Sequence, residues 1–277
     1  MDIPLGVGNI IRVALEEDVG QGDVTTILLI PEDSISKAHY IAKEDFILAG
    51  LPFALEVFKI IDSSISYKTF YEDGSKIKKG DVIAEISGKT RVILKGERVS
   101  LNFLQRLSGI ATLTNKYVKK IKGLKAKILD TRKTTPCIRF MEKYAVKIGG
   151  GYNHRFGLFD GILIKDNHIK ILGSIKKAIN RTKKGHHLFK IEVEVKNHKE
   201  LKEAIEAGAD IVMLDNMSID EVKKAVEIAR GMVMLEASGN ISLDNVIEVA
   251  ETGVDFISIG ALTHSAPAVD INLKIVG

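Results

Sequence analysis

Residues 191–259 read IEVEVKNHKELKEAIEAGADIVMLDNMSIDEVKKAVEIARGMVMLEASGNISLDNVIEVAETGVDFISI, a run in which apolar and amphipathic stretches alternate. The apolar, strand-like runs lie at residues 191–195, 211–214, 232–235 and 256–259. The amphipathic stretches have helical spacing and lie at residues 198–207, 219–229 and 243–251. This alternation is typical of parallel strands joined by crossover helices.

Capping signals stand at the ends of these stretches. Ser218 precedes Glu221 by three residues and Ser242 precedes Asn245 by three, as at a capped helix start. Gly208 stands where the first of these helices should end, and Gly253 where the last should end.

Two earlier apolar runs, at residues 127–129 and 161–164, raise the number of expected parallel strands to at least six. That number favours a closed α/β barrel. An open, doubly wound sheet is the alternative, but no G-x-G-x-x-G turn follows a strand.

The first half of the chain has a different pattern. Short strands with turn signals between them are expected at residues 37–40, 47–49, 64–71 and 82–86. Helices are expected at residues 51–60 and 97–120, the second interrupted near Gly109. We therefore predict an N-terminal α+β sandwich domain (1–109), a barrel domain (110–265) and a C-terminal tail (266–277) that packs back on the first domain.

Composition excludes several classes of protein. Hydrophobic residues make up 45% of the 277 and charged residues 27%, which is ordinary for a globular protein. The net charge of +4 is spread among acidic residues, so we expect neither a nucleic-acid partner nor a membrane partner. The single cysteine, Cys137, excludes an intrachain disulfide and suits a reducing compartment.

Targeting signals are not expected either. The segment MDIPLGVGNI has neither a basic start nor a long apolar core, and no apolar run approaches the ~20 residues that span a bilayer. A cytoplasmic enzyme is therefore the expected class.

Cations gather after two of the strands. Three segments carry them: DTRKTTP (130–136), GGGYNHRFG (149–157) and LIKDNH (163–168). They supply Arg132, Lys133, His154, Arg155 and Lys165. The carboxyl ends of barrel strands meet on one rim, so these cations would face one multiply anionic ligand.

Carboxylates and small residues follow the later strands. Glu194 and Asp215 could hold Mg²⁺ through water, or the hydroxyls of a sugar. The Ser238–Gly239 and Gly260–Ala261 loops expose backbone N–H groups of the kind that bind phosphate. A lone strand-end charge is more often a solvated loop residue or an ion pair, so the argument depends on their convergence.

Longer segments carry a family resemblance over nearly the whole chain. They are ALEEDVGQGDVTT (14–26), GERVSLNFLQRLSGIAT (96–112), DTRKTTP, GGGYNHR, LIKDNH, EVEV (192–195), AGADIVMLDN (207–216), LEASGNI (235–241) and ETGVDFISIGALTHSAPAVDINL (251–273). On these segments the chain resembles the quinolinate phosphoribosyltransferase family, whose carboxylating reaction yields nicotinate mononucleotide.

The resemblance implies an N-terminal α/β sandwich followed by an incomplete, open parallel α/β barrel. It implies transfer of phosphoribosyl from phosphoribosyl pyrophosphate to quinolinate, with Mg²⁺, giving nicotinate mononucleotide, CO₂ and pyrophosphate for NAD biosynthesis. The matching arginine of the family's ERxxLN segment, here Arg98, reaches into the neighbouring subunit's site. A homodimer is therefore implied, and assembly of dimers into a hexamer is left open.

The resemblance also implies roles for individual residues. Quinolinate would be bound by Thr131, Arg132, His154, Arg155 and Lys165, and the catalytic residues would be Lys133, Glu194 and Asp215. Lys133 would face the pyrophosphate or the reacting carboxylate, and the two acids would hold the Mg²⁺-bound ribose and pyrophosphate. The 5′-phosphate would lie against Ser238, Gly239, Asn240, Gly260, Ala261 and Leu262. His264 is assigned no role.

Two residues depart from the family pattern. Cys137 stands where the family usually has glycine after TTP, and Asn240 makes SGNI where SGGI is usual. Asparagine tolerates a positive φ better than most residues, so the phosphate loop should survive. The Cys137 thiol is either acidic beside so many cations or an inert loop residue.

Three other functions are alternatives. The molybdenum-associated paralogue shares the fold, but its motifs diverge in the TRKTTP and KDNH regions, which this chain keeps. An aldolase-type barrel would use Lys165 as a Schiff base. A phosphate-binding barrel without catalysis would have lost Glu194, Asp215 or Lys165, and all three are present.

Overall fold

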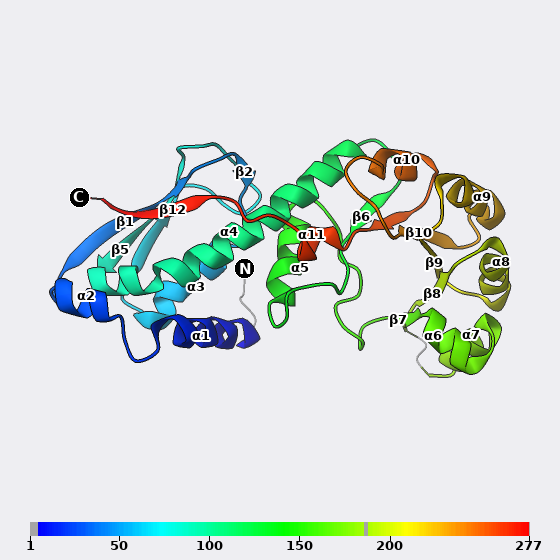
Figure 1. The fold of residues 1–277 in the computed structure, drawn as a ribbon, viewed down its shortest axis with the longest axis horizontal. Helices are drawn as coiled ribbons and strands as arrows, with labels where there is room; N and C mark the ends of the chain where they lie inside the picture. Colours follow the sequence, from blue (N-terminus) through cyan, green and yellow to red (C-terminus); the bar gives the residue numbers. More distant parts are fainter. Residues whose placement is uncertain (1–4, 186–187, 277) are drawn as a thin grey trace. The chain divides into compact units, whose positions relative to one another are not determined.

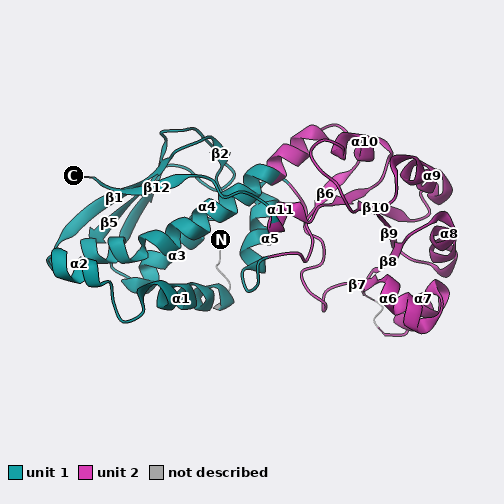
Figure 2. Cartoon of the chain, in the orientation of Figure 1, with its two compact units in different colours: residues 1–113, 135–150, 265–277 teal, residues 114–134, 151–264 magenta. Residues whose placement is uncertain are grey.

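The computed structural model describes residues 5–185 and 188–276. These residues form two compact units, coloured separately in Figure 2. The first unit holds residues 5–113, 135–150 and 265–276, and the second holds 114–134 and 151–264 of the described chain. The predicted domain bounds differ from these units. The prediction placed residues 135–150 in the barrel domain and ended the first domain at residue 109.

The first unit contains helices and mostly antiparallel strands. Its helices are α1 (Leu5–Val19), α2 (Val24–Leu29), α3 (Leu51–Ile61), α5 (Arg139–Ile148) and the first part of α4 (Thr90–Lys120). Its strands are β1 (Ile35–Ala42), β2 (Phe46–Ile47), β3 (Ser66–Thr69), β4 (Lys76–Ile77), β5 (Val82–Lys89) and β12 (Ile271–Val276).

An antiparallel sheet in the order β12-β1-β5-β3 organises this unit. Strand β1 alternates between exposed and buried positions, and Ala38, Tyr40 and Ala42 point into the core. Residues of α3 and α4 fill that core, including Phe58 and Leu104, which are fully buried. The C-terminal strand β12 belongs to this sheet through its pairing with β1.

Helix α4 runs without a break through Gly109, so the predicted interruption there is wrong. Gly109 serves a close approach instead, because a Cβ at this position would lie 2.0 Å from the carbonyl oxygen of Pro267. The glycine therefore lets the segment that leads to β12 cross the helix at backbone distance. The helix also begins at Thr90, seven residues before the predicted start.

The second unit is built from alternating strands and helices. Its strands are β6 (Lys127–Leu129), β7 (Ile162–Ile164), β8 (Ile191–Val195), β9 (Ile211–Asp215), β10 (Met234–Ser238) and β11 (Phe256–Ser258). Its helices are α6 (Asp166–Leu172), α7 (Ile175–Thr182), α8 (His198–Ala207), α9 (Ile219–Ala229), α10 (Val246–Glu251) and α11 (Ala261–His264).

All six strands are parallel and lie in the order β6-β11-β10-β9-β8-β7 (Figure 1). Strands β6 and β7 are the two edges of this sheet, so the barrel is incomplete, as the resemblance implied, and not closed. The sandwich-plus-open-barrel fold is therefore confirmed.

Several predicted details are correct. Helices α8 and α9 have the predicted bounds, Ser218 and Glu221 form a capping box, and Gly208 ends α8 with φ 82°. Strand β10 lies further along the chain than predicted, so that Glu236 and Ser238 belong to the strand itself. Helix α10 begins at Val246 and not at residue 243. No helix among the described residues is long and apolar enough to cross a membrane.

Substitution Gly109→Ala should destabilise the protein by at least about 2 kcal/mol, since a methyl group would overlap the Pro267 backbone. Gly8→Ala is the matched control. Gly8 is also helical but has open space around its Cβ position, so alanine should stabilise by about 0.5–1 kcal/mol. Denaturant unfolding of both variants measures the difference, and equal effects would contradict the close-approach argument.

Candidate functional site

A cavity of about 240 Å³ lies in the second unit at the carboxyl ends of its parallel strands. Its lining consists of Thr131, Arg132, Lys133, His154, Arg155, Leu163, Lys165, Glu194, Met213, Asp215, Glu236, Ser238 and Ser258. Every strand from β6 to β11 supplies a residue from its own length or from just beyond its end. Side chains of six neighbouring strands can converge in this way only if the sheet curves around them.

The predicted cation cluster lines this cavity. Arg132, Lys133, His154, Arg155 and Lys165 are all present, together with Thr131. These residues come from separate turns of the chain, so the fold brings the cations together.

Arg155 has a hydrogen-bond donor that no described residue of the cluster satisfies. Burial and, next, the neighbouring charge of Arg132 lower the pKa of its guanidinium. Its Nη1 donates to the carbonyl of Gly161 at 2.9 Å, but its buried Nε has no hydrogen-bond partner among the described residues. Two adjacent guanidiniums with a donor left over indicate an anionic ligand.

Lys165 and the carboxylates of Glu194 and Asp215 form another part of the lining. Lys165 caps α6, and its Nζ lies 3.7 Å from Oε2 of Glu194. Burial raises the pKa of Glu194; Lys165 opposes this shift, and the charge of Asp215 adds to it. Two carboxylates in one partly buried site could hold a divalent cation, so their chemistry fits the expected Mg²⁺.

Hydrogen bonds of its backbone to two threonine side chains hold Lys133 in place. Its N–H donates to Oγ1 of Thr131 at 3.0 Å, and its carbonyl accepts from the hydroxyl of Thr263 in α11 at 2.7 Å. A Cβ on Gly260 would lie 3.0 Å from Cδ of Lys133 and 3.1 Å from the ring of His264. The small residue thus makes room for the Lys133 side chain, and His264, which the sequence left without a role, lies next to it.

The predicted phosphate loop follows β10. Gly239 has φ 96°, and a Cβ there would lie 2.1 Å from Oδ1 of Asn216. Asn240 has φ 51°, in the left-handed region that asparagine tolerates, and its amide donates to Asn216 at 3.2 Å. Ser238 lines the cavity, whereas Gly239 and Asn240 do not.

The other predicted phosphate-binding residues also lie outside the lining. These are Gly260, Ala261 and Leu262, of which Leu262 is fully buried. Arg98 is exposed on α4 in the first unit and does not line the cavity, so its role stays a prediction. Cys137 is exposed with φ 67°, a backbone conformation that explains why glycine suits this position.

Sequence reasoning missed a buried acid cluster beneath the cations. Nε2 of His154 lies 2.9 Å from Oε2 of Glu192 and 3.9 Å from Oε2 of Glu236. Glu192 is 6% exposed and Glu236 1%. Burial and the adjacent Glu192 raise the pKa of Glu236 to about 8, while His154 opposes the shift. The signal was present in IEVEV, because Glu192 and Glu194 stand two apart and so share one face of β8.

Both ring nitrogens of His154 are used inside this cluster. The N–H of Arg155 donates to Nδ1 at 2.8 Å, so Nε2 carries the ring proton and donates it to Glu192. The three side chains are close enough to surround a metal ion, since their ligand atoms lie within 4.8 Å. A protonated Nε2 has no lone pair to offer a metal, so hydrogen bonding explains the group better.

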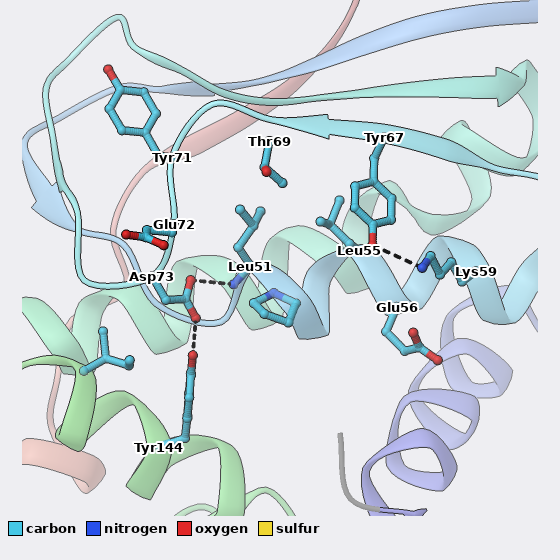
Figure 3. Close-up of a pocket in the computed structure, with 12 residues that line it drawn as sticks. Leu51, Leu55, Glu56, Lys59, Tyr67, Thr69, Tyr71, Glu72, Asp73 and Tyr144 are labelled. Carbon is cyan, nitrogen blue, oxygen red and sulfur yellow. Dashed lines mark hydrogen bonds between the residues drawn. The ribbon is translucent and has the colours of Figure 1, made fainter. Parts of the chain in front are cut away.

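A larger cavity, of about 620 Å³, lies in the first unit (Figure 3). Three acidic side chains and one lysine line it, so it does not suit an anion. Figure 3 shows that Asp73 is already engaged: it accepts from the N–H of Leu51 at 3.1 Å and from the hydroxyl of Tyr144 at 2.7 Å. These contacts start α3 and hold α5, so we assign this cavity a structural role and place the function in the second unit.

Comparisons with known proteins show which family the chain is similar to. Residues 23–108 match the model of the quinolinate phosphoribosyl transferase N-terminal domain, and residues 110–274 match that of the C-terminal domain. A probable nicotinate-nucleotide pyrophosphorylase (carboxylating) of Methanocaldococcus jannaschii is 46% identical over 277 residues, covering 96% of each chain. That of Bacillus subtilis is 45% identical over 260 residues, covering 94% of this chain and 90% of the relative.

Solved structures show the same likeness. The nicotinate-nucleotide pyrophosphorylase of Francisella tularensis superposes with a TM-score of 0.93 at 47% identity, covering 99% of this chain and 98% of that one. The corresponding enzyme of Ehrlichia chaffeensis gives a TM-score of 0.94 at 40% identity over the whole of both chains. With both family models matched in order and the cation-lined cavity in place, the chain belongs to the quinolinate phosphoribosyl transferase family.

Proposed function

We propose that the protein transfers phosphoribosyl from phosphoribosyl pyrophosphate to quinolinate with loss of CO₂, giving nicotinate mononucleotide and pyrophosphate for NAD biosynthesis. The observation that carries this proposal is the cavity of the second unit, where two guanidiniums and two lysines converge on one space. Quinolinate carries two carboxylates on adjacent ring carbons, and such a pair matches two guanidiniums side by side. The named relatives of the family support the choice of reaction.

The cations bind the quinolinate carboxylates in this proposal. Arg155 has its buried Nε available, and Arg132 lies close enough to affect its pKa. Lys165, at the start of α6, supplies a third positive charge to the lining. His154 acts differently from what the resemblance implied: because both of its nitrogens are engaged within the protein, it positions Arg155.

Phosphoribosyl transfer builds positive charge on the ribose as pyrophosphate leaves. Glu194 and Asp215 stabilise that charge, and Lys133 neutralises the departing pyrophosphate. The same two carboxylates would hold Mg²⁺ that arrives with the substrate; when bound, it supplies charge neutralisation at the pyrophosphate. Ser238 and the backbone N–H groups of the Gly239–Asn240 turn donate to the 5′-phosphate, together with those of Gly260, Ala261 and Leu262 at the start of α11.

Decarboxylation needs no further cofactor chemistry from the protein. Once the ring nitrogen is ribosylated it is cationic, and it draws the electron pair left behind by the departing 2-carboxylate. The arginines must hold that carboxylate without stabilising it beyond the transition state, because ground-state binding alone does not accelerate the step.

We further propose that the active unit is a homodimer in which Arg98 enters the neighbouring site. Arg98 is exposed on α4, and no residue of the first unit that the structure describes lines the cavity. Assembly of dimers into hexamers and a cytoplasmic location stay predictions from the sequence.

Purified protein mixed with Mg²⁺, phosphoribosyl pyrophosphate and quinolinate labelled at the 2-carboxylate should release labelled CO₂ and form nicotinate mononucleotide. Nicotinate in place of quinolinate should give no product, because its single carboxylate leaves part of the cation cluster without a counter-charge. Label release should require both substrates. Absence of CO₂ and pyrophosphate from the folded protein would exclude this function.

Unfolding and refolding Arg98→Ala together with Lys165→Ala, each inactive alone, should restore activity to about a quarter of the sites, since half of random dimers carry one intact site. The matched control pairs Lys165→Ala with Glu194→Ala. Both of those residues line the same chain's cavity, so no mixed dimer gains an intact site. Equal activity of the two mixtures would contradict the exchange of Arg98.

A further inference from the structure

The proposed reaction leaves one proton without a source. When CO₂ departs, its bonding electrons stay on ring carbon C2, and a proton must replace the lost group there. A positioned acid typically accelerates such a transfer by about 10²–10⁴-fold. None of the roles assigned above supplies that proton.

Glu236 lies where such an acid is needed. Its side chain extends from β10 into the cavity that the cations line, next to Ser238 on the same face of the strand. It is 1% exposed, and its Oε1 has no hydrogen-bond partner among the described residues. A protonated carboxyl carries no charge, so at this position it can face an anionic ring without repelling it.

The surroundings of Glu236 favour its protonated form. Glu192 faces it from β8, His154 from the loop between α5 and β7, and Ser258 stands on β11. The other charged groups of the cavity are Arg132, Lys133, Arg155, Lys165, Glu194 and Asp215. Burial and Glu192 raise the pKa of Glu236 to about 8. Because Glu192 and Glu236 are adjacent and buried, they cannot both be ionised at low cost.

A second cavity gives the acid a route to solvent. Its volume is about 410 Å³, and residues at the amino ends of the strands line it, including Lys127, Ile211 and Phe256. Glu236 and His154 line both this cavity and the cation-lined one, whereas Glu192 lines this cavity alone. The acid cluster therefore separates the substrate side of the sheet from an opening at its other end.

We propose that Glu236 is the catalytic acid that protonates C2 of the decarboxylated ring, and that it regains its proton from water in the second cavity. In this step the bond between C2 and the carboxylate breaks and CO₂ leaves. The O–H bond of Glu236 breaks next, and its proton forms the new C2–H bond with the electron pair on C2. Glu236 becomes a carboxylate, whose charge His154 stabilises, and it then takes up from solvent, through the second cavity, the proton that the reaction consumes. This inference rests on the proposed function and extends it.

The lysines of the cavity are weaker candidates for this acid. Lys165 is half exposed and forms an ion pair with Glu194, with Nζ 3.7 Å from Oε2. Release of its proton would break that ion pair. Loss of a lysine proton would also remove positive charge from beside the anionic substrate.

The protonated state of Glu236 has a consequence for stability. The unfolded chain releases this proton at its ordinary pKa of 4.5, whereas the folded protein keeps it up to about pH 8. Between those two values the unfolded state holds fewer protons, so this residue makes the folded protein less stable as pH rises. The free energy of unfolding should therefore fall less steeply over this range in Glu236→Gln than in the wild type. Equal slopes would mean that Glu236 is ionised in the folded protein.

Single-turnover kinetics of Glu236→Gln test the catalytic role. Pyrophosphate release should stay within about threefold of the wild-type rate, whereas formation of nicotinate mononucleotide should slow by about 100-fold or more. N-ribosylated quinolinate should accumulate, and Glu236→Asp, which keeps an acid, should recover part of the second rate. Glu227→Gln, an exposed residue of α9, is the matched control for loss of a carboxylate and should behave as wild type.

The outcomes separate the two proposals. Equal slowing of both steps, or no slowing of either, would overturn the role of Glu236 while leaving the proposed function in place. No product from wild-type protein would remove the proposed function and this step with it. If Glu236→Gln does not fold, the wild type alone decides: its product-forming step should slow above about pH 8 and in D₂O, and pyrophosphate release should not.

Discussion

The two faces of one parallel sheet have opposite chemistry, and the rest of the second unit depends on that difference. Val193, Val195 and Leu235 are buried, whereas Glu194 and Glu236, which alternate with them, line the cavity. Successive side chains of a strand point to opposite faces, so curvature of the sheet gathers all the inward ones around a single space. Helices cover the apolar face, and a ligand site forms on the charged one.

Positive charges that lie this close together need a negative charge nearby to offset their repulsion. Burial lowers the pKa of the Arg155 guanidinium, and repulsion from the charge of Arg132 lowers it further. The negative charge of Glu192 beneath them opposes this shift, and His154 links Glu192 to the backbone of Arg155. The buried acid thus offsets part of the positive charge at Arg155, and in the proposed function the substrate carboxylates complete the pairing.

Glycine positions show a second constraint, the close approach of backbones. Gly109 admits the Pro267 carbonyl against α4, and Gly239 admits Asn216 beside the expected phosphate turn. Gly109 does not interrupt α4, although an interruption was predicted there from the sequence. A glycine within a helical pattern marks either a break or a near neighbour, and a neighbour 158 residues away in the chain cannot be read from local sequence.

The sequence by itself determined the alternation of strands and helices, the bounds of α8 and α9, and the cations of the cavity, because periodicity, caps and strand-end charges are local properties. Tertiary structure alone decided that Glu236 belongs to β10 and that this acid lies against Glu192 and His154. It also decided which nitrogen of His154 is available, since that depends on the Arg155 backbone. The physical reason is the same for each: hydrogen-bond partners, burial and shifts of pKa arise between residues that only folding brings together.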